Sequence, residues 1–250
     1  MPHPHLIAAN WKMNGLKSSI PMAKSIADKA RDYNARVAIF PPFTLLPLLA
    51  QALDGTDVIL GGQNCHYADG GAYTSGISAA MLKDAGAQLV LLGHSERRQG
   101  LAESCMLIAR KAAAAIRGGL EPVICIGETA DERDAGLTYK VLERHLRDSL
   151  PEELNGNVFH IAYEPVWAIG SGKTATDGQI LEAFDQIRDH LHGRFGSQAA
   201  THLLYGGSVN PANARQILSL EGISGALVGG ASLQAETFLP IVEAASLALA

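Results

Sequence analysis

Cysteine is scarce in this chain of 250 residues, and the placement of the few cysteines argues against disulfide bonds and metal binding. The three cysteines, Cys65, Cys105 and Cys125, are odd in number and lie far apart, without a CxxC pair or a His/Cys spacing typical of metal ligands. We therefore expect neither a disulfide framework nor a zinc site. The place of Cys125 in an apolar run predicts a buried core thiol.

An excess of basic residues and a long hydrophobic run are also missing. The net charge is −5, which argues against a general nucleic-acid binder but leaves room for a local basic pocket that holds a small anion. Residues 1–10 lack the basic and apolar regions of a signal peptide. The most apolar uncharged stretch, 37–53, contains Pro41, Pro42 and Pro47 and is not a membrane-spanning helix. We expect a reduced, cytoplasmic protein without a membrane partner.

Hydrophobic residues are abundant at 47%, and charged residues make up 18%, so the chain can bury a large core. Short runs that are apolar on both faces alternate with longer helical patterns, as buried parallel strands alternate with helices. The predicted strands are 6–9, 37–40, 58–60, 88–92, 122–126, 158–163, 202–205 and 225–228. The predicted helices include 18–33, 44–53, 77–85, 102–117, 137–150 and 234–248.

Two further helices are predicted from capping signals. Thr176 and Gln179 have the spacing of a capping box and precede an apolar stripe. Asn210 and Pro211 resemble an N-cap followed by a first-turn proline. Each of the eight strands is then followed by a helix, at about 31 residues per unit, which is typical of a single (β/α)8 barrel over residues 1–250. A doubly wound open sheet is the main alternative.

Polar residues cluster where the predicted strands end. In a barrel these ends meet on one face, where active sites form. A lone lysine or histidine in such a place is more often structural, and a glycine pair is more often a turn. Here, however, a lysine, a histidine, a glutamate and two glycine pairs all fall on one face of the barrel, which favours a functional site. The residues concerned are Asn10, Trp11, Lys12, His94, Ser95, Glu96, Arg97, Arg98, Glu164, Pro165, Gly206, Gly207, Ser208, Gly229 and Gly230.

The chemistry of this set favours proton transfer on a phosphate compound. Glu164 and His94 provide a carboxylate and an imidazole, with no metal site or thiol nucleophile beside them, and this combination suits proton transfer more than hydrolysis. Gly229 and Gly230 precede a helix predicted to begin at Ala231, and free backbone N–H groups at such a place bind phosphate.

The stretch Gly170-Ser171-Gly172-Lys173-Thr174 resembles a nucleotide-binding loop but fails its spacing. The P-loop requires glycine at position 167, where this chain has Trp167. The GxGxxA pattern begins seven residues after the predicted strand ends at Tyr163, whereas the dinucleotide motif follows its strand directly. A lid rich in small residues is the better interpretation.

Five segments together resemble the signature segments of the triosephosphate isomerase family. They are 8–15 (AANWKMNG), 93–98 (GHSERR), 162–176 (AYEPVWAIGSGKTAT), 205–210 (YGGSVN) and 228–233 (VGGASL), in the family's order from the first strand to the last helix. The resemblance implies a homodimeric isomerase that interconverts dihydroxyacetone phosphate and D-glyceraldehyde 3-phosphate through an enediol(ate), in glycolysis and gluconeogenesis. It implies no cofactor and no metal.

The resemblance also implies roles for individual residues. Glu164 would be the base that shuttles the proton between the two carbons, and His94 the electrophile that polarises the carbonyl. Lys12 would attract the phosphate and stabilise the enediolate, Asn10 would bind a substrate oxygen, and Glu96 would be a nearby supporting carboxylate. Ser95 would hold Glu164 while the lid is open.

The resemblance further predicts a lid that closes over the substrate. The predicted lid and clamp residues are Pro165, Val166, Trp167, Ala168, Ile169, Gly170, Ser171, Gly172, Lys173, Thr174, Ala175 and Leu227. Gly170 would donate its N–H to the phosphate together with Ser208, Gly229 and Gly230. Ser171 stands where the family usually has Thr, a change between two small hydroxyl residues with little expected effect.

The loop 63–78 resembles the family's inter-subunit loop, and one of its residues departs from the pattern. Tyr73 and Thr74 resemble its tip, which would reach Asn10 and Glu96 of the partner subunit. Gly76 stands where the family usually has an acidic residue that pairs with Arg97 of the partner subunit. An exposed pair contributes at most about 1 kcal/mol, so we still expect the dimer. Arg97, if buried, needs another acceptor.

Two other hypotheses stay open at this point. Another phosphate-binding barrel, such as an aldolase or a tryptophan-pathway enzyme, would form a Schiff base on Lys12, which borohydride would trap. A relative that has lost its activity would bind phosphoglycolate without turning substrate over. The presence of Lys12, His94 and Glu164 together argues against the second of these.

Overall fold

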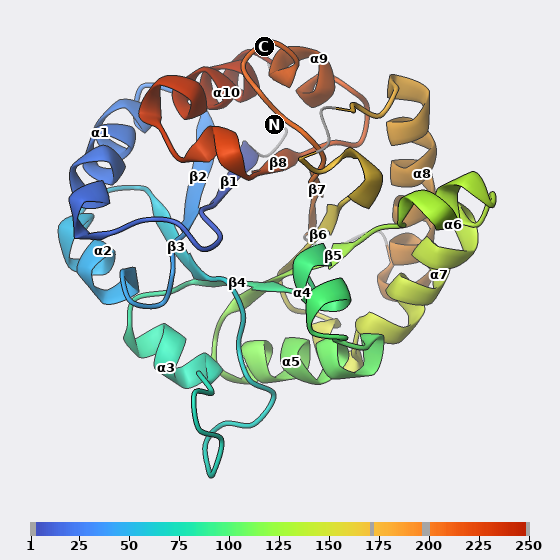
Figure 1. Cartoon of the computed structure of the whole chain (residues 1–250), viewed down its shortest axis with the longest axis horizontal. Coiled ribbons are helices and arrows are strands. Elements are labelled where there is room, and N and C mark those ends of the chain that lie inside the picture. The colour runs from blue at the N-terminus through green and yellow to red at the C-terminus, as the bar shows by residue number, and fades with distance from the viewer. Residues whose placement is uncertain (1–3, 171–172, 197–200, 249–250) are drawn as a thin grey trace.

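The strands form a closed parallel barrel surrounded by helices (Figure 1). The structure is a computed structural model that describes residues 4–170, 173–196 and 201–248. Neighbouring strands pair in chain order, and β1 pairs with β8 to close the barrel, so the doubly wound open sheet is excluded. The strands are β1 (His5–Asn10), β2 (Ala35–Phe40), β3 (Ile59–Gly62), β4 (Leu89–Leu92), β5 (Glu121–Ile126), β6 (Phe159–Tyr163), β7 (Thr201–Tyr205) and β8 (Gly225–Val228).

The two faces of each strand pack into two different apolar clusters. In β1, Leu6 and Ala8 belong to the cluster inside the barrel, whereas Ile7 and Ala9 pack against the surrounding helices. This arrangement explains why the predicted strands are apolar on both faces. Cys125 belongs to the inner cluster and is fully buried, and burial raises the pKa of its thiol well above the usual value.

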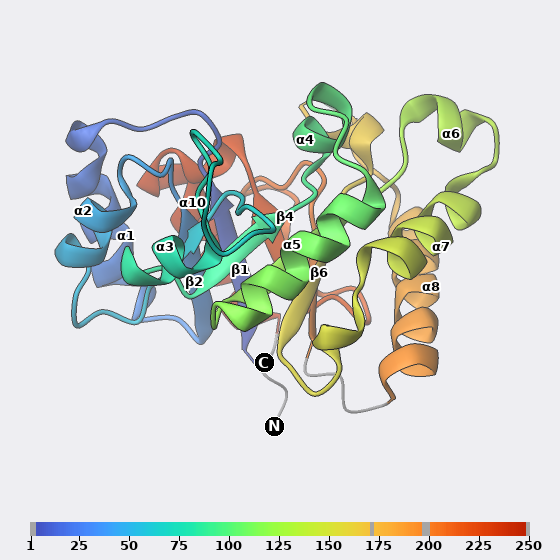
Figure 2. The same ribbon diagram turned by 90° about the horizontal axis from the view of Figure 1, so that it is seen from below.

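Helices of very different lengths cover the outside of the barrel, as the side view also shows (Figure 2). The α-helices are α1 (Ile20–Ala30), α2 (Leu46–Ala52), α3 (Ala79–Asp84), α4 (Ser95–Gly100), α5 (Cys105–Arg117), α6 (Ala130–Asp134), α7 (Thr138–Ser149), α8 (Asp177–Phe195), α9 (Ala214–Leu218) and α10 (Ala235–Leu247). Short 3-10 helices are η1 (Lys17–Ser19), η2 (Glu152–Leu154), η3 (Val166–Ala168) and η4 (Gly230–Ser232). None of the described helices is both long enough and apolar enough to cross a membrane.

The predicted elements are present, and their ends shift where side chains cap the backbone. The capping box of Thr176 and Gln179 is confirmed at the start of α8, with hydrogen bonds of 2.9 and 3.3 Å. The helix predicted from residue 102 begins at Cys105, because Ser104 accepts the N–H of Leu107. Strand β3 runs on to Gly62, whereas residues 58, 88 and 158 lie outside the strands.

The prediction that Asn210 acts as a cap is confirmed, but the regular helix begins later than expected. Asn210 Oδ1 accepts the N–H groups of Ala212 and Asn213 at 2.9 and 3.2 Å, and its carbonyl accepts the N–H of Ala214 at 3.0 Å. Helix α9 begins only at Ala214. Similarly, Ala231 lies inside the 3-10 helix η4 rather than at the start of α10. Helices α4 and α6 were not predicted, because five or six residues are too few to show a helical period.

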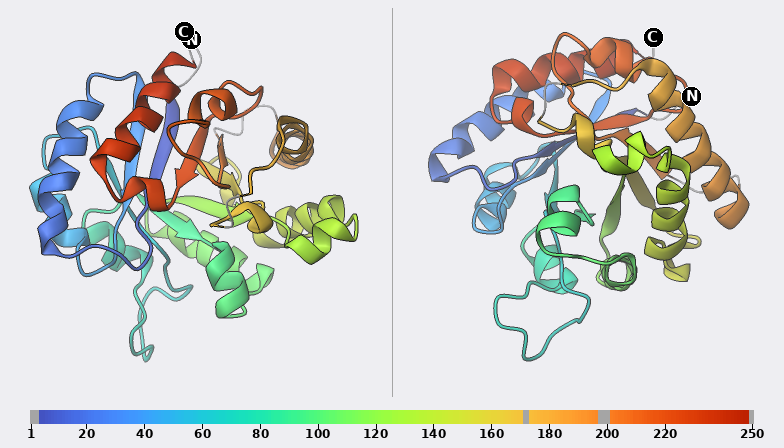
Figure 3. Two further views of the ribbon diagram at one scale, coloured as in Figure 1. Left: turned by 45° about the horizontal axis from the view of Figure 1, so that its top comes forward. Right: turned by 45° about the vertical axis from the view of Figure 1, so that its right-hand side comes forward.

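The connection between β3 and α3 projects away from the barrel, as two orientations show (Figures 1 and 3). Its exposed tip carries Tyr73 and Thr74. Tyr73 packs against the rings of His66 and Tyr67 at centroid distances of 4.2 and 6.0 Å, and Arg110 lies over the Tyr67 ring. These contacts give the projecting loop an ordered base.

Candidate active site

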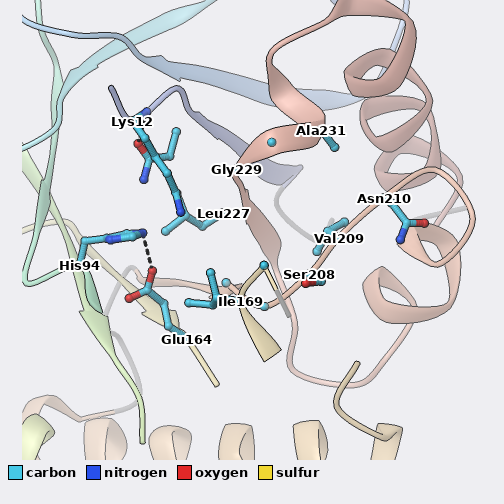
Figure 4. Close-up of a pocket in the computed structure, with 15 residues that line it drawn as sticks. Lys12, His94, Glu164, Ile169, Ser208, Val209, Asn210, Leu227, Gly229 and Ala231 are labelled. Atoms are coloured by element: carbon cyan, nitrogen blue, oxygen red, sulfur yellow. Dashed lines mark hydrogen bonds and ion pairs between the residues drawn. The ribbon is translucent and has the colours of Figure 1, made fainter. Parts of the chain in front are cut away.

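The predicted catalytic and phosphate-binding side chains line one pocket at the carboxyl ends of the strands (Figure 4). Its volume is about 390 Å³. The predicted residues that line it are Asn10, Lys12, His94, Glu164, Ile169, Gly170, Ser208, Leu227, Gly229 and Gly230. Val209, Asn210 and Ala231 line it as well, and they were not predicted as site residues. Glu96 lies just outside and reaches the pocket through Lys12.

Glu164 follows β6 directly and is only 2% exposed. One carboxylate oxygen, Oε1, lies 2.9 Å from His94 Nε2, and the other, Oε2, accepts the backbone N–H of Ser95 at 2.8 Å. The contact with Ser95 agrees with the predicted holding role of that residue. Gly127 permits the close approach of the two strand ends, because a Cβ there would lie 1.7 Å from the Glu164 carbonyl oxygen.

His94 is the N-cap residue of α4, and this placement orients its ring. Nδ1 accepts the backbone N–H of Glu96 at 3.3 Å, which assigns the ring hydrogen to Nε2, toward Glu164. Burial alone would lower the pKa of His94. The charge of Glu164 and its hydrogen bond outweigh burial, however, and raise the pKa above the usual value in the unliganded protein.

Lys12 is held in an unusual backbone conformation, with a φ of 52°, in the left-handed region that few residues other than glycine adopt. Its N–H donates to Asn10 Oδ1 at 3.1 Å, and its carbonyl accepts from Gln63 Nε2 at 2.8 Å. Its ammonium group lies 2.7 Å from Glu96 Oε1. Burial would raise the pKa of Glu96, but the hydrogen bond from Lys12 and the neighbouring charges lower it.

Backbone N–H groups and a cation meet at the far end of the pocket. Gly229 is the N-cap of η4, and the Lys12 side chain passes close beside it into the pocket. A Cβ at Gly229 would lie 3.5 Å from Lys12 Cε. The Ser208 hydroxyl donates to the Ala168 carbonyl at 2.5 Å and so ties this end of the pocket to the lid. A phosphate placed here would meet opposite charge and free donors.

The first part of the predicted lid folds as the 3-10 helix η3. Val166 N donates to the carbonyl of Glu128 at 3.0 Å, and the indole Nε1 of Trp167 donates to the Glu128 carboxylate at 2.9 Å. Ile169 faces Leu227 across the pocket (Figure 4). Ser171 and Gly172 lie outside the described residues. Lys173, Thr174 and Ala175 connect the lid to the cap of α8.

Two residues that support the site were not predicted. Glu128 is fully buried and accepts hydrogen bonds from Arg133 at 2.9 Å, from the Tyr163 hydroxyl at 3.1 Å and from Trp167. Gln63, at the end of the β3 region, holds the Lys12 backbone. Glu128 follows β5 and Gln63 follows β3. Both are polar residues just after a strand, which is the pattern that predicted the other site residues.

Arg97 finds a carboxylate within its own chain. Its Nε and Nη2 donate to Glu103 Oε1 at 2.9 and 2.6 Å, and the buried Lys111 lies 2.5 Å from the same oxygen. Glu103 is therefore the other acceptor that the absence of an acidic residue at position 76 required. Among the described residues, no group of three or more His, Cys, Asp or Glu is placed to hold a metal ion.

Comparison with known proteins identifies the family. The family model described as triosephosphate isomerase matches residues 5–245. The triosephosphate isomerase of Caulobacter vibrioides is 50% identical over 246 residues, 97% of each chain, and that of Xanthobacter autotrophicus is 49% identical over 96% of each. The crystal structure of triosephosphate isomerase from Bartonella henselae superposes with a TM-score of 0.91 at 44% identity, covering 97% of this chain and 99% of that one. The chain therefore belongs to the triosephosphate isomerase family.

Proposed function

We propose that Glu164, His94, Lys12 and Asn10 carry out the reaction of this family, the interconversion of dihydroxyacetone phosphate and D-glyceraldehyde 3-phosphate in glycolysis. The chain is an isomerase of that family. The observation that carries the assignment is the contact between Glu164 and His94 at the wall of a pocket whose other end holds Lys12 and two backbone glycines. In this proposal residues 1–250 act as one domain.

The two groups in contact divide the chemistry between them. Glu164 removes a proton from the carbon next to the carbonyl, and negative charge develops on the carbonyl oxygen. The Nε2–H of His94 and the ammonium of Lys12 stabilise that charge, which they do best in a site that excludes water. His94 passes a proton to the former carbonyl oxygen and takes the proton of the neighbouring hydroxyl, and Glu164 returns its proton to the neighbouring carbon. The carbonyl and the hydroxyl have then exchanged places, and the number of protons is unchanged.

The phosphate end and the lid serve the same reaction. Gly229, Gly230, Ser208 and Gly170 are the donors we propose for the phosphate, next to Lys12. Closure of the lid would press Ile169 and Leu227 over Glu164 and keep water from the enediolate, which can otherwise lose its phosphate. That no cofactor or metal takes part, and that the enzyme also serves gluconeogenesis, are parts of the same proposal.

A homodimer in the cytoplasm completes the proposal. Next to the active site lies a second hollow of about 200 Å³, lined among others by Asn10, Glu96 and Arg97. The exposed tip with Tyr73 and Thr74 projects from the barrel, and we assign it to such a hollow on a second copy. This arrangement supports a role for the partner's Thr74 in holding Asn10 and Glu96.

Replacement of the proposed base tests the assignment. We expect Glu164→Gln and Glu164→Asp to lower kcat in a coupled isomerase assay by about 10²–10⁴-fold, the range for loss of a positioned acid or base. The exposed Glu221 provides the control, Glu221→Gln, which should keep full activity. Full activity of either Glu164 variant would refute the mechanism. Phosphoglycolate binding without turnover by the unmodified protein would instead indicate a relative that only binds.

A further inference from the structure

A second cavity shares Glu164 with the substrate pocket and is otherwise lined by different residues. It measures about 140 Å³ and we call it the rear cavity; the residues that matter here are Ser95, Gln99, Glu132, His145 and Glu164. Glu164 lines both the rear cavity and the substrate pocket. Its Oε1 contacts His94, which lines the substrate pocket, and its Oε2 accepts the N–H of Ser95, which lines the rear cavity.

Two polar atoms of the rear cavity, on side chains that are themselves buried, have no protein hydrogen-bond partner among the described residues. They are Ser95 Oγ and His145 Nε2, on side chains that are 6% and 7% exposed. His145 Nδ1 accepts the N–H of Gly127 at 3.4 Å, so the ring hydrogen is on Nε2. Burial, with help from nearby arginines, lowers the pKa of His145 to about 3. The ring is thus a neutral donor at neutral pH, and a buried donor of this kind needs an acceptor.

The lining of the rear cavity selects its occupant. Glu132 and Glu164 bring negative charge, while the donors of the one cation, Arg98, are directed to Gly93, Cys125, Ser149 and Cys105. An anion is disfavoured by that balance, and an apolar molecule would leave the polar groups unsatisfied. Water can both donate and accept, and at about 30 Å³ per molecule the volume holds roughly four waters.

The cavity runs from the surface to the proposed base. Gln99 at one end is exposed and Glu132 is partly exposed, whereas Ser95, His145 and Glu164 at the other end are buried. Waters hydrogen-bonded between these groups would connect the carboxylate with bulk solvent. With the proposed lid closed over the substrate side, the rear cavity would offer Glu164 a path to solvent.

We propose that the rear cavity holds a chain of hydrogen-bonded waters through which the proton on Glu164 exchanges with solvent during turnover. The inference rests on the proposed role of Glu164 as the base. The carboxylic acid formed by proton abstraction gives its proton to the first water, the chain passes a proton out to bulk solvent, and a solvent proton returns to the carboxylate. No charge accumulates, and the hydrogen delivered to the product then comes from solvent.

Isotope partitioning tests this path. Substrate deuterated at the reacting carbon is converted in ordinary water, and mass spectrometry measures the ratio of exchanged to transferred label in the product. We expect His145→Phe to lower that ratio about fivefold, the effect of removing one hydrogen bond from a bound water, with kcat/KM unchanged. The matched control, His145→Gln, keeps a donor and should retain the ratio of the unmodified protein.

Other outcomes separate the path from the proposed function. An unchanged ratio in His145→Phe, or complete transfer of label in the unmodified protein, would overturn the rear path. If the unmodified protein had no isomerase activity, the proposed function itself would be refuted. If circular dichroism shows that His145→Phe is misfolded, Gln99→Leu at the exposed rim provides the second variant. We expect it to lower the ratio of exchanged to transferred label by the same factor. An unchanged ratio in Gln99→Leu would likewise refute the rear path.

Discussion

At the scale of single residues, the state of His94 depends on where Glu164 lies. In the unliganded protein Glu164 attracts a proton to His94, whereas burial and the nearby Lys12 oppose it. Movement of the carboxylate toward a substrate carbon would weaken that attraction. His94 would then be most readily neutral when its Nε2–H is needed as a hydrogen-bond donor to the substrate oxygen.

This dependence predicts a direction for the pKa of His94 in Glu164→Gln. The pKa should fall below that of the unmodified protein, because the attraction of the carboxylate is lost while burial and Lys12 remain. NMR titration of the ring would measure it. Glu96→Gln is the control and should give a smaller fall, since the contribution of Glu96 is the weakest of those that raise the pKa. An equal or higher pKa in Glu164→Gln would contradict the argument.

Loss of the Glu103 carboxylate should cost considerable stability. Glu103 is 7% exposed and neutralises Arg97 and the buried Lys111, so Glu103→Gln leaves buried positive charge without a partner. We expect the free energy of unfolding in urea at pH 7 to fall by about 3–5 kcal/mol. Glu152→Gln, which breaks a surface pair with Arg194, should cost less than about 1 kcal/mol.

The stabilisation that Glu103 provides should decrease as the pH falls. Burial opposes ionisation of Glu103, but its two cations lower the pKa below the usual value. Its stabilising effect is therefore fully present above the pKa of the unfolded chain and is lost as the pH falls through the lower pKa of the folded protein. The difference in the free energy of unfolding between Glu103→Gln and the unmodified protein should become smaller over that acidic range. A difference that grows there would contradict the stabilising role of the Glu103 carboxylate.

At the scale of elements, the fixed end of the lid is held by a buried carboxylate. Glu128 binds Trp167 of η3 by its side chain and Val166 by its carbonyl, while Arg133 of α6 lies over the Trp167 ring at 4.9 Å. The short helix α6 and the lid thus share one anchor. This anchor fixes η3, which is the first part of the predicted lid.

Replacing Trp167 with Phe should loosen that anchor. The variant removes one donor from Glu128 but leaves Arg133 and Tyr163, so we expect a loss of about 1 kcal/mol in local stability. Amide hydrogen exchange at 166–169 should become faster. Trp11→Phe is a matched control, because the buried Nε1 of Trp11 has no partner among the described residues, and it should leave exchange in the lid unchanged. Equal exchange in both variants would argue against the anchor.

At the scale of the whole molecule, the active site lies beside the surface that we assign to the partner. Lys12, Glu96 and Arg97 line the second hollow, and the neighbouring Met13 is 97% exposed. An apolar side chain left this exposed beside a site is consistent with cover by a second subunit. Glu103 has already paired Arg97, so the absence of a carboxylate at Gly76 does not leave a buried charge alone.

Dilution provides the matching prediction. We expect turnover per subunit to fall as the protein is diluted to monomer, detected by light scattering, because Asn10 and Glu96 would lose the contact of the partner's Thr74. In Thr74→Ala the turnover per subunit should fall by the same amount at a smaller dilution. Constant turnover across the change in mass would remove the inter-subunit role from Thr74 and leave the chemistry of the pocket unaffected.

The sequence by itself determined the eight alternating units, because apolar periodicity and caps such as Thr176 act over a few neighbouring residues. Closure into a barrel was decided by the pairing of β1 with β8. The sequence also determined the polar strand ends, through motifs that resemble a known family. Only the tertiary structure decided that Glu103 replaces an acceptor at position 76, that Glu128 anchors the lid, and that a cavity with His145 lies behind Glu164. These features join residues that are distant along the chain or lie on different elements, so closure of the barrel brings them together and no local pattern records them.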